Sequence, residues 1–263
     1  MSALSIRLAP ANTPEPQKAS RPVEDAERWN SPYDDERLEP VVSVFMTRPA
    51  YIRVCVHACS ESIEVGGAMI GEWCADRETG EQFVVVKHVL PARFTRQGAV
   101  YLTFTQDSLV DLHDQIEKRF PGEKIIGWYH THPQMGVFLS HYDTWLHSHF
   151  FPEPWQVALV VEPYSSIAGF FIRQTNGNLD PTRYFGFYEM DGANGHSIVR
   201  WHNLQKVDVK PQSVEAKPKV EIKSREDKSN ELVSQQVEAR PKVAIKSREE
   251  RFQSDETKGG KNL

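Results

Sequence analysis

Hydrophobic and polar positions follow a regular pattern only in the middle of this chain. Between residues 41 and 202, short apolar runs of strand length are separated by turn residues and by segments with helical spacing. Because strands and helices are interleaved, the fold class is α/β (α+β), a single domain with a mixed central β-sheet flanked by helices. The runs predict strands over residues 41–46, 64–73, 82–90, 100–105, 124–130, 157–161, 169–173 and 183–188.

Three segments carry the signals of helices. Residues 107–120 have an apolar stripe and are followed by Pro121 and Gly122, which end a helix. Residues 140–150 predict another helix. Residues 48–60 begin with a proline in the first turn, where its missing N–H is tolerated. Their apolar positions recur at helical spacing, which predicts this buried stripe: Ile52, Cys55, Val56 and Cys59.

The two ends of the chain lack this pattern. Residues 1–40 hold six of the 17 prolines, together with eight acidic and five basic side chains. Proline removes a backbone donor, so we predict a mostly disordered Pro-rich arm, which serves as a linker or a docking segment. Residues 203–263 contain 14 basic and 11 acidic side chains and one aromatic residue, Phe252. They predict a disordered charged tail, so the domain is expected to span residues 41–202.

The tail repeats itself with a period of 23 residues. Residues 214–227 recur almost unchanged as residues 237–250. Two copies are too few for a solenoid, which needs about three or more. The repeat is either a tandem duplication within a solvated tail or a doubled Lys-Val-x-Ile-Lys motif that binds the sheet edge of a partner protein.

Composition excludes several classes of protein. The apolar fraction is 39%, below the usual value of about 45–50%. The net charge of −5 does not favour binding to nucleic acid. No run approaches the roughly 18–20 apolar residues of a membrane span, and residues 1–16 show no signal peptide. Three cysteines cannot form a disulfide framework, so we expect a cytoplasmic protein.

Candidate metal ligands lie in one stretch, residues 127–143. His130 and His132 are two positions apart at the end of a predicted strand, so both side chains point to the same face. Asp143 follows after a loop and is a plausible third ligand. Two histidines, one carboxylate and a water molecule form the open site of a catalytic zinc, so we predict one Zn²⁺ per chain.

A second His-x-His pair serves as an internal comparison. His147 and His149 lie in a predicted helix, where positions i and i+2 are about 200° apart, so they cannot bind one ion together. His147 falls one turn after Asp143, where it could lie next to the metal ligands, although an ordinary helix histidine is the favoured interpretation. The three cysteines, which have no Cys-x-x-Cys spacing, are interpreted as core residues.

The wider motif is more specific than its ligands. The stretch His-Thr-His-Pro, followed by Ser140-x-x-Asp143 after a loop of fixed length, resembles the JAMM (MPN+) zinc metalloprotease family. The flanking Ile-Ile-Gly-Trp-Tyr and the upstream residues 63–71 are similar to the same family. The resemblance covers residues 41–190. It implies the MPN/JAB fold, which is cytidine-deaminase-like, and a zinc ion bound by His130, His132 and Asp143.

The resemblance also implies catalytic roles for two further residues. Glu64 matches the family's glutamate, which acts as general base and then as acid; Glu72, eight residues on, is the rival position. Ser140 matches the serine that donates a hydrogen bond to the oxyanion. Ser140 and Asp143 also have the spacing of a capping box, and both roles are compatible. Gln134 stands where many relatives have glycine, which affects the predicted shape of the substrate groove.

These residues predict a zinc metallopeptidase that cleaves peptide or isopeptide bonds, acting at the C-terminus of ubiquitin or a ubiquitin-like protein. Two other functions remain open. One is a non-catalytic MPN scaffold, although such relatives typically lose one or more of the five site residues that are all present in this chain. The other is an amidohydrolase that acts on a non-protein substrate at the same zinc site.

Overall fold

The computed structural model describes residues 14–34, 38–92, 95–98, 101–104, 106–190 and 196–207. All of them belong to one compact unit. The duplicated segments of the predicted tail lie outside the described residues. Among the residues that are described, no helix combines the length and apolar character that a bilayer crossing requires.

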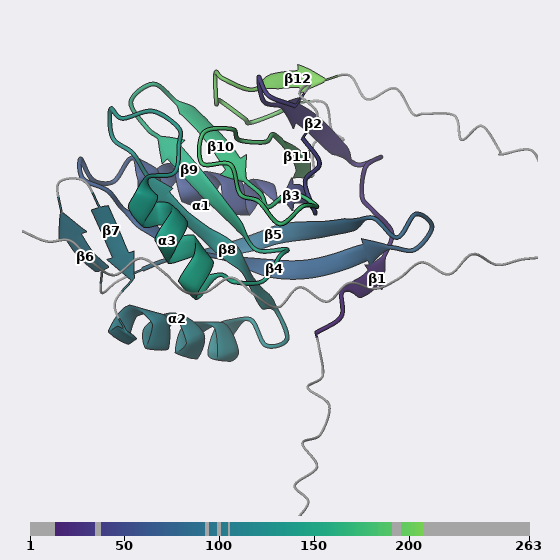
Figure 1. Cartoon of the computed structure of the whole chain (residues 1–263), viewed down its shortest axis with the longest axis horizontal. Helices are drawn as coiled ribbons and strands as arrows, with labels where there is room; N and C mark the ends of the chain where they lie inside the picture. The colour runs from purple at the N-terminus through teal and green to yellow at the C-terminus, as the bar shows by residue number, and fades with distance from the viewer. Residues whose placement is uncertain are drawn as a thin grey trace, which may run out of the picture. The chain divides into compact units, whose positions relative to one another are not determined.

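A mixed sheet of ten strands organises the domain (Figure 1). Its order is β10-β9-β8-β4-β5-β3-β11-β2-β12, and β1 pairs in parallel with the far end of β4. The predicted class, a mixed sheet with flanking helices, is confirmed. The strands are β1 Gln17–Ala19, β2 Ala26–Asn30, β3 Ser43–Met46, β4 Gly66–Asp76, β5 Gln82–Pro91, β8 Lys124–Thr131, β9 Val157–Glu162, β10 Ile167–Phe171, β11 Phe187–Met190 and β12 Gln205–Val207.

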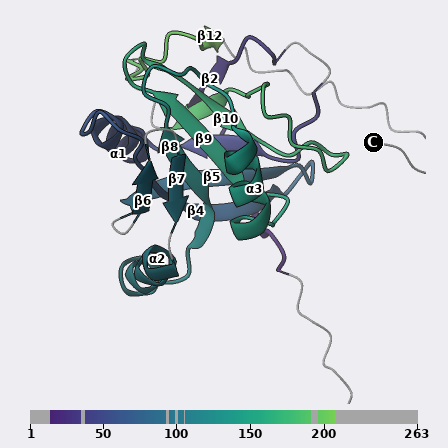
Figure 2. The same cartoon turned by 60° about the vertical axis from the view of Figure 1, so that its left-hand side comes forward.

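Two helices cover opposite faces of this sheet (Figures 1 and 2). Helix α1 (Arg48–Ala58) packs on β5 and β8, and α3 (His141–Phe150) lies on the other face. Helix α2 (Gln106–Arg119) follows a separate hairpin. This hairpin consists of β6 (Thr95–Gly98), which the sequence pattern did not predict, and β7 (Tyr101–Phe104).

Strand β8 occupies the middle of the core. It pairs in antiparallel fashion with β4 and in parallel with β9, so both of its edges are hydrogen-bonded. Ile126, Trp128 and Tyr129 are fully buried. The backbones of β8 and β9 approach so closely that a Cβ atom on Gly127 would lie 1.8 Å from the Val157 carbonyl oxygen. Only glycine fits there, because it has no Cβ atom. Gly127 thus allows β8, the strand that carries His130, to lie close beside β9.

The first 40 residues differ from the predicted disordered arm. Strand β2 pairs with β11 on one side and with β12 on the other, and β1 pairs with residues 74–76 of β4. The prediction is therefore wrong for residues 17–19 and 26–30. Prolines interrupt a ladder only at their own positions, and these strands lie between Pro16, Pro22 and Pro32. Strand β2 is half-buried and polar, so it carries no apolar pattern that would predict it.

Helix α1 begins at the predicted residue and ends two residues earlier than predicted, and it buries a different face. Its buried residues are Ala50, Tyr51, Val54 and Ala58. Ile52 and Val56, from the predicted stripe, are 51% and 58% exposed. Both stripes have helical spacing, and tertiary contacts decide between them: the backbone N–H of Arg200 donates to the Tyr51 hydroxyl, and the Tyr51 ring packs on Trp201.

Three further expectations need correction. Of the three cysteines assigned to the core, Cys74 is buried, Cys55 is half-buried and Cys59 is exposed. The last predicted strand, residues 183–188, is found as β11, which begins only at Phe187. The domain also continues past its expected end at residue 202, because Leu204 is buried and β12 pairs with β2.

Candidate metal centre

The end of strand β8 carries both histidines of the motif. His130 lies within the strand and His132 directly after it, and their side chains point to the same face, as their spacing predicts. The two side chains are 0% and 3% exposed. Their Nε2 atoms lie 3.0 Å apart, so the two imidazoles converge on one point.

Helix α3 brings the third group to the same point. Asp143 lies in its first turn; its Oδ1 is 3.5 Å from His130 Nε2 and its Oδ2 is 3.6 Å from His132 Nε2. Ser140 caps this helix: its Oγ accepts from the Asp143 backbone N–H, and its own N–H donates to Asp143 Oδ2 at 2.7 Å. The predicted capping box therefore exists, and it also fixes the aspartate in place.

These three residues form a donor set that suits a metal cation. One ligand atom from each lies within 4.8 Å of the others, and all three residues are buried. Burial lowers the pKa of His130, which favours its neutral form. Burial opposes ionisation of Asp143, but the proximity of both histidines and the hydrogen bond from Ser140 outweigh burial and lower the pKa of the carboxyl well below its usual range. Neutral imidazoles and an ionised carboxylate are the protonation states that zinc requires of its ligands.

Aromatic packing holds the histidine rings. Trp128 stacks on His130 with centroids 4.4 Å apart and 9° between the planes, and Phe138 lies 4.8 Å from the His132 ring. The Nδ1 atoms of both histidines are buried, and neither has a hydrogen-bond partner among the described residues. Stacking therefore supplies the orientation that a hydrogen bond to the second ring nitrogen often provides.

His147 takes part in this packing and is more than an ordinary helix histidine. Its ring is fully buried, and the Trp128 indole N–H donates to its Nδ1 at 3.1 Å. Burial, together with the charge of Arg173, lowers the pKa of His147 to about 3, so the ring is neutral and can accept this bond. The sequence analysis did not identify Trp128 or Phe138. Trp128 lies two positions before His130, on the same face of the strand, which was an available signal.

Glu64 lies beside this cluster, just before strand β4. It is 4% exposed. The next residue, Val65, is hydrogen-bonded to Thr131 of β8: the Val65 N–H donates to the Thr131 hydroxyl, and the Thr131 N–H donates to the Val65 carbonyl. Burial raises the pKa of Glu64 to about 7; His132 lowers it and the nearby Asp143 raises it. The rival position, Glu72, instead binds the Lys87 ammonium at 2.5 Å and pairs in register with Val85, well along the strand.

The loop after His132 is held by one buried acid. Glu162, at the end of β9, accepts hydrogen bonds from the backbone N–H groups of Gln134, Tyr164 and Ser165. Gln134 has φ +61°, in the left-handed region where glycine is favoured. The position at which many relatives have glycine therefore keeps a glycine-like backbone with a longer side chain.

Residues 41–151 match the family model described as JAB1/Mov34/MPN/PAD-1 ubiquitin protease. The chain carries a JAB/MPN domain. It is 27% identical over 143 residues to the 26S proteasome non-ATPase regulatory subunit 14 of Caenorhabditis elegans, which covers 53% of this chain and 44% of that protein. It is 29% identical over 132 residues to COP9 signalosome complex subunit 5 of Candida albicans, covering 47% of this chain and 20% of that protein.

A third relative is named for a different activity. The chain is 35% identical over 83 residues to the NAD(+) hydrolase TcpA of a Theionarchaea archaeon, which covers 31% of this chain and 25% of that protein. The JAB/MPN chain thus spans less than half the length of each of these three relatives. The similarity supports the domain.

Proposed function

We propose that this JAB/MPN chain is a zinc-dependent peptidase that hydrolyses peptide or isopeptide bonds at the C-terminus of ubiquitin or a ubiquitin-like protein. The observation that carries the proposal is the convergence of His130, His132 and Asp143 beside the buried carboxyl of Glu64. A non-catalytic scaffold has no need of a buried acid next to an intact set of ligands. We expect one zinc ion per chain and a cytoplasmic location.

Each residue of the site has a role in this proposal. When bound by the two histidines and Asp143, zinc would supply a Lewis acid that lowers the pKa of water and polarises a carbonyl group. Glu64, with its pKa near neutrality, takes a proton from the attacking water and delivers it to the leaving amine. Ser140 Oγ accepts one hydrogen bond from Asp143, which leaves its own hydrogen to donate to the developing oxyanion.

The substrate class rests on the relatives. The family description names a ubiquitin protease, and two relatives are named as a proteasome subunit and a COP9 signalosome subunit. The name of the archaeal relative refers to NAD(+) hydrolysis, but the match covers a quarter of that protein. We therefore propose that the bond hydrolysed is a peptide or isopeptide bond.

A zinc measurement combined with a cleavage assay tests the proposal. The full chain is expected to contain about one zinc per molecule and to release the C-terminal partner from a ubiquitin-like fusion protein. Glu64→Gln should retain zinc and lose turnover, because the amide cannot accept the proton. Glu72→Gln is the matched control, since Glu72 binds Lys87, and it should retain activity.

The outcomes separate the alternatives. A chain without zinc and without cleavage would indicate the scaffold. A zinc-loaded chain that cleaves no ubiquitin-like fusion but hydrolyses a small amide would indicate the amidohydrolase. Full turnover by Glu64→Gln would overturn the role of Glu64 while leaving the metal site intact.

A further inference from the structure

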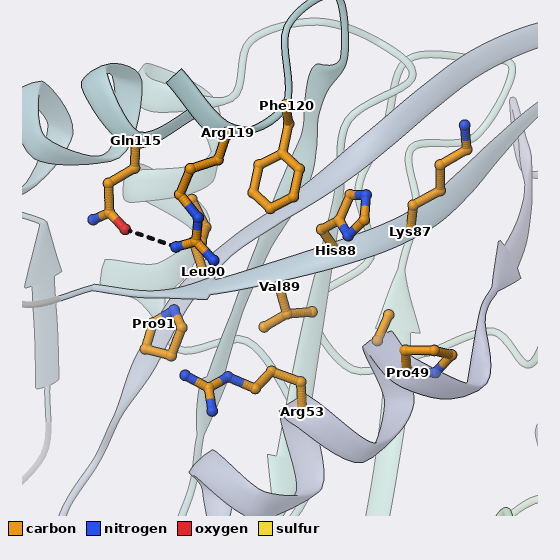
Figure 3. A pocket seen from close by; sticks show the side chains of 11 residues that line it. Pro49, Arg53, Lys87, His88, Val89, Leu90, Pro91, Gln115, Arg119 and Phe120 are labelled. Atoms are coloured by element: carbon orange, nitrogen blue, oxygen red, sulfur yellow. Dashed lines mark hydrogen bonds between the residues drawn. The ribbon is translucent and has the colours of Figure 1, made fainter. Parts of the chain in front are cut away.

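A cavity lies between helices α1 and α2 and over strand β5 (Figure 3). Its volume is about 310 Å³, which falls within the size range of small-molecule sites. None of the residues that line it belongs to the metal centre described above. The cavity is therefore a site distinct from the proposed metal centre.

Basic side chains dominate its polar lining, and two of them lie beside carboxylates. Lys87 binds Glu72 at 2.5 Å and lies 3.7 Å from Glu123. His88 lies 3.5 Å from the other oxygen of Glu123. The positive charge of Lys87 is thus largely balanced within the protein, and His88 already has an acidic neighbour.

The two arginines are different. Among the described residues, neither Arg53 nor Arg119 has a carboxylate within ion-pair distance. Arg119 donates a hydrogen bond to Gln115 at 3.3 Å and lies 5.3 Å over the Phe120 ring. These neutral contacts orient its guanidinium without removing its charge. Arg53 and Arg119 come from different helices and reach toward the same part of the cavity, near Leu90 and Pro91 (Figure 3).

Two guanidinium groups that share one cavity repel each other, and arginine cannot relieve the repulsion by losing a proton. An oxyanion between them would remove this cost and accept hydrogen bonds from both. A tetrahedral phosphate presents oxygens in several directions, so it can serve two arginines from opposite walls, whereas a carboxylate presents one planar edge. The remaining wall is apolar and includes Pro49, Val89 and Leu90.

We propose that this cavity binds a small phosphate-bearing molecule, with Arg53 and Arg119 holding the phosphate and the apolar wall packing against the rest of the ligand. The site is independent of the proposed hydrolase activity. Zinc content and cleavage of a ubiquitin-like fusion should therefore be the same in variants of these two arginines and in the unchanged chain.

Calorimetric titration of the full chain with pyrophosphate tests the site. We expect saturable binding, and Arg53→Gln and Arg119→Gln should each weaken it about tenfold or more, the size expected for one charge-assisted hydrogen bond. The matched control is Lys118→Gln, which removes a positive charge from the same helix at a residue paired with Asp114. This control should bind pyrophosphate as the unchanged chain does.

Three results would overturn the proposal. One is the absence of pyrophosphate binding at millimolar concentration. Another is equal weakening by Lys118→Gln, which would indicate a general charge effect. The third is binding of citrate as tight as that of pyrophosphate, which would show that the arginines do not distinguish phosphate from carboxylate. Thermal unfolding of each variant shows whether it is folded, and a variant that fails to fold is replaced by Arg53→Lys or Arg119→Lys, which keep the charge and lose the planar fork.

Discussion

At the scale of single residues, the buried carboxyl of Glu64 creates a pH dependence that can be measured without zinc. Its pKa is raised from 4.5 to about 7. Below pH 4.5 the carboxyl is protonated in both the folded and the unfolded chain, so its contribution to stability is fully present. As pH rises toward 7, the unfolded chain ionises first, and up to about 3 kcal/mol of this contribution is lost.

Urea unfolding of the metal-free chain at several pH values isolates this effect. The free energy of unfolding of the unchanged chain, minus that of Glu64→Gln, should fall by about 3 kcal/mol between pH 4 and pH 8. Taking the difference cancels the titration of His130, whose pKa is shifted in the opposite direction. A difference that does not vary with pH would show that Glu64 has an ordinary pKa.

The Trp128–His147 hydrogen bond makes a second prediction at this scale. His147→Leu removes the acceptor of the buried indole N–H, which should cost about 1–3 kcal/mol of stability. The Trp128 ring stacks on His130, so loss of its anchor should also weaken zinc binding about tenfold. Competition with a chelator measures the zinc affinity.

Two comparisons sharpen this test. His149→Leu changes the exposed histidine of the same helix, whose Nδ1 lies near the Trp145 carbonyl, and it should leave zinc affinity unchanged. His147→Gln offers a carbonyl oxygen to the indole and should restore part of the affinity. Equal zinc affinity in His147→Leu and the unchanged chain would show that Trp128 needs no anchor.

At the scale of elements, the loop between β8 and α3 contains backbone strain that can be removed. Gln134 has φ +61°, a conformation that costs a residue with a side chain about 1 kcal/mol. Gln134→Gly should therefore stabilise the domain by up to about 1 kcal/mol, less than the full strain because glycine also gains freedom in the unfolded chain. Chemical unfolding measures the gain.

Gly136 gives the opposite comparison in the same loop. It has φ +89°, and a Cβ atom placed there would meet nothing within 4 Å, so Gly136→Ala isolates the conformational cost. This variant should lose about 1 kcal/mol. If both variants lose stability equally, the side chain of Gln134 contributes more than its backbone costs.

At the scale of the whole molecule, segments from both ends of the domain form one edge of the sheet. The Asn203 side chain exchanges two hydrogen bonds with the backbone of Ala168, at 3.0 and 2.8 Å. Leu204 is buried, and β12 pairs with β2 near the N-terminus. Residues 203–207 therefore belong to the fold.

Truncation locates this boundary. A chain that ends at His202 should lose about 3 kcal/mol or more relative to one that ends at Val207, because it exposes the surface under Leu204 and leaves the Ala168 N–H and C=O without Asn203. Urea unfolding of the two chains measures the difference. Equal stability would place the end of the domain at residue 202, as the sequence pattern predicted.

The sequence by itself indicated the candidate metal ligands and the strands around them. The spacing of His130 and His132 is two residues, and a strand places such positions on one face whatever surrounds it. Ser140 and Asp143 form a capping box, which is also a local interaction. The positions of β4, β5, β8 and β9 followed from apolar runs, since a buried strand needs apolar residues throughout.

Only the tertiary structure decided the features that depend on distant contacts. Strand β2 is polar and exists because β11 and β12 supply its hydrogen bonds. Helix α1 carries two stripes with helical spacing, and contacts with residues 200 and 201 select the one that is buried. Trp128 meets His147, and Arg53 and Arg119 come to line one cavity, only after the chain has folded. Local pattern reports which residues favour burial, but their partners are set by packing among segments that are far apart in the chain.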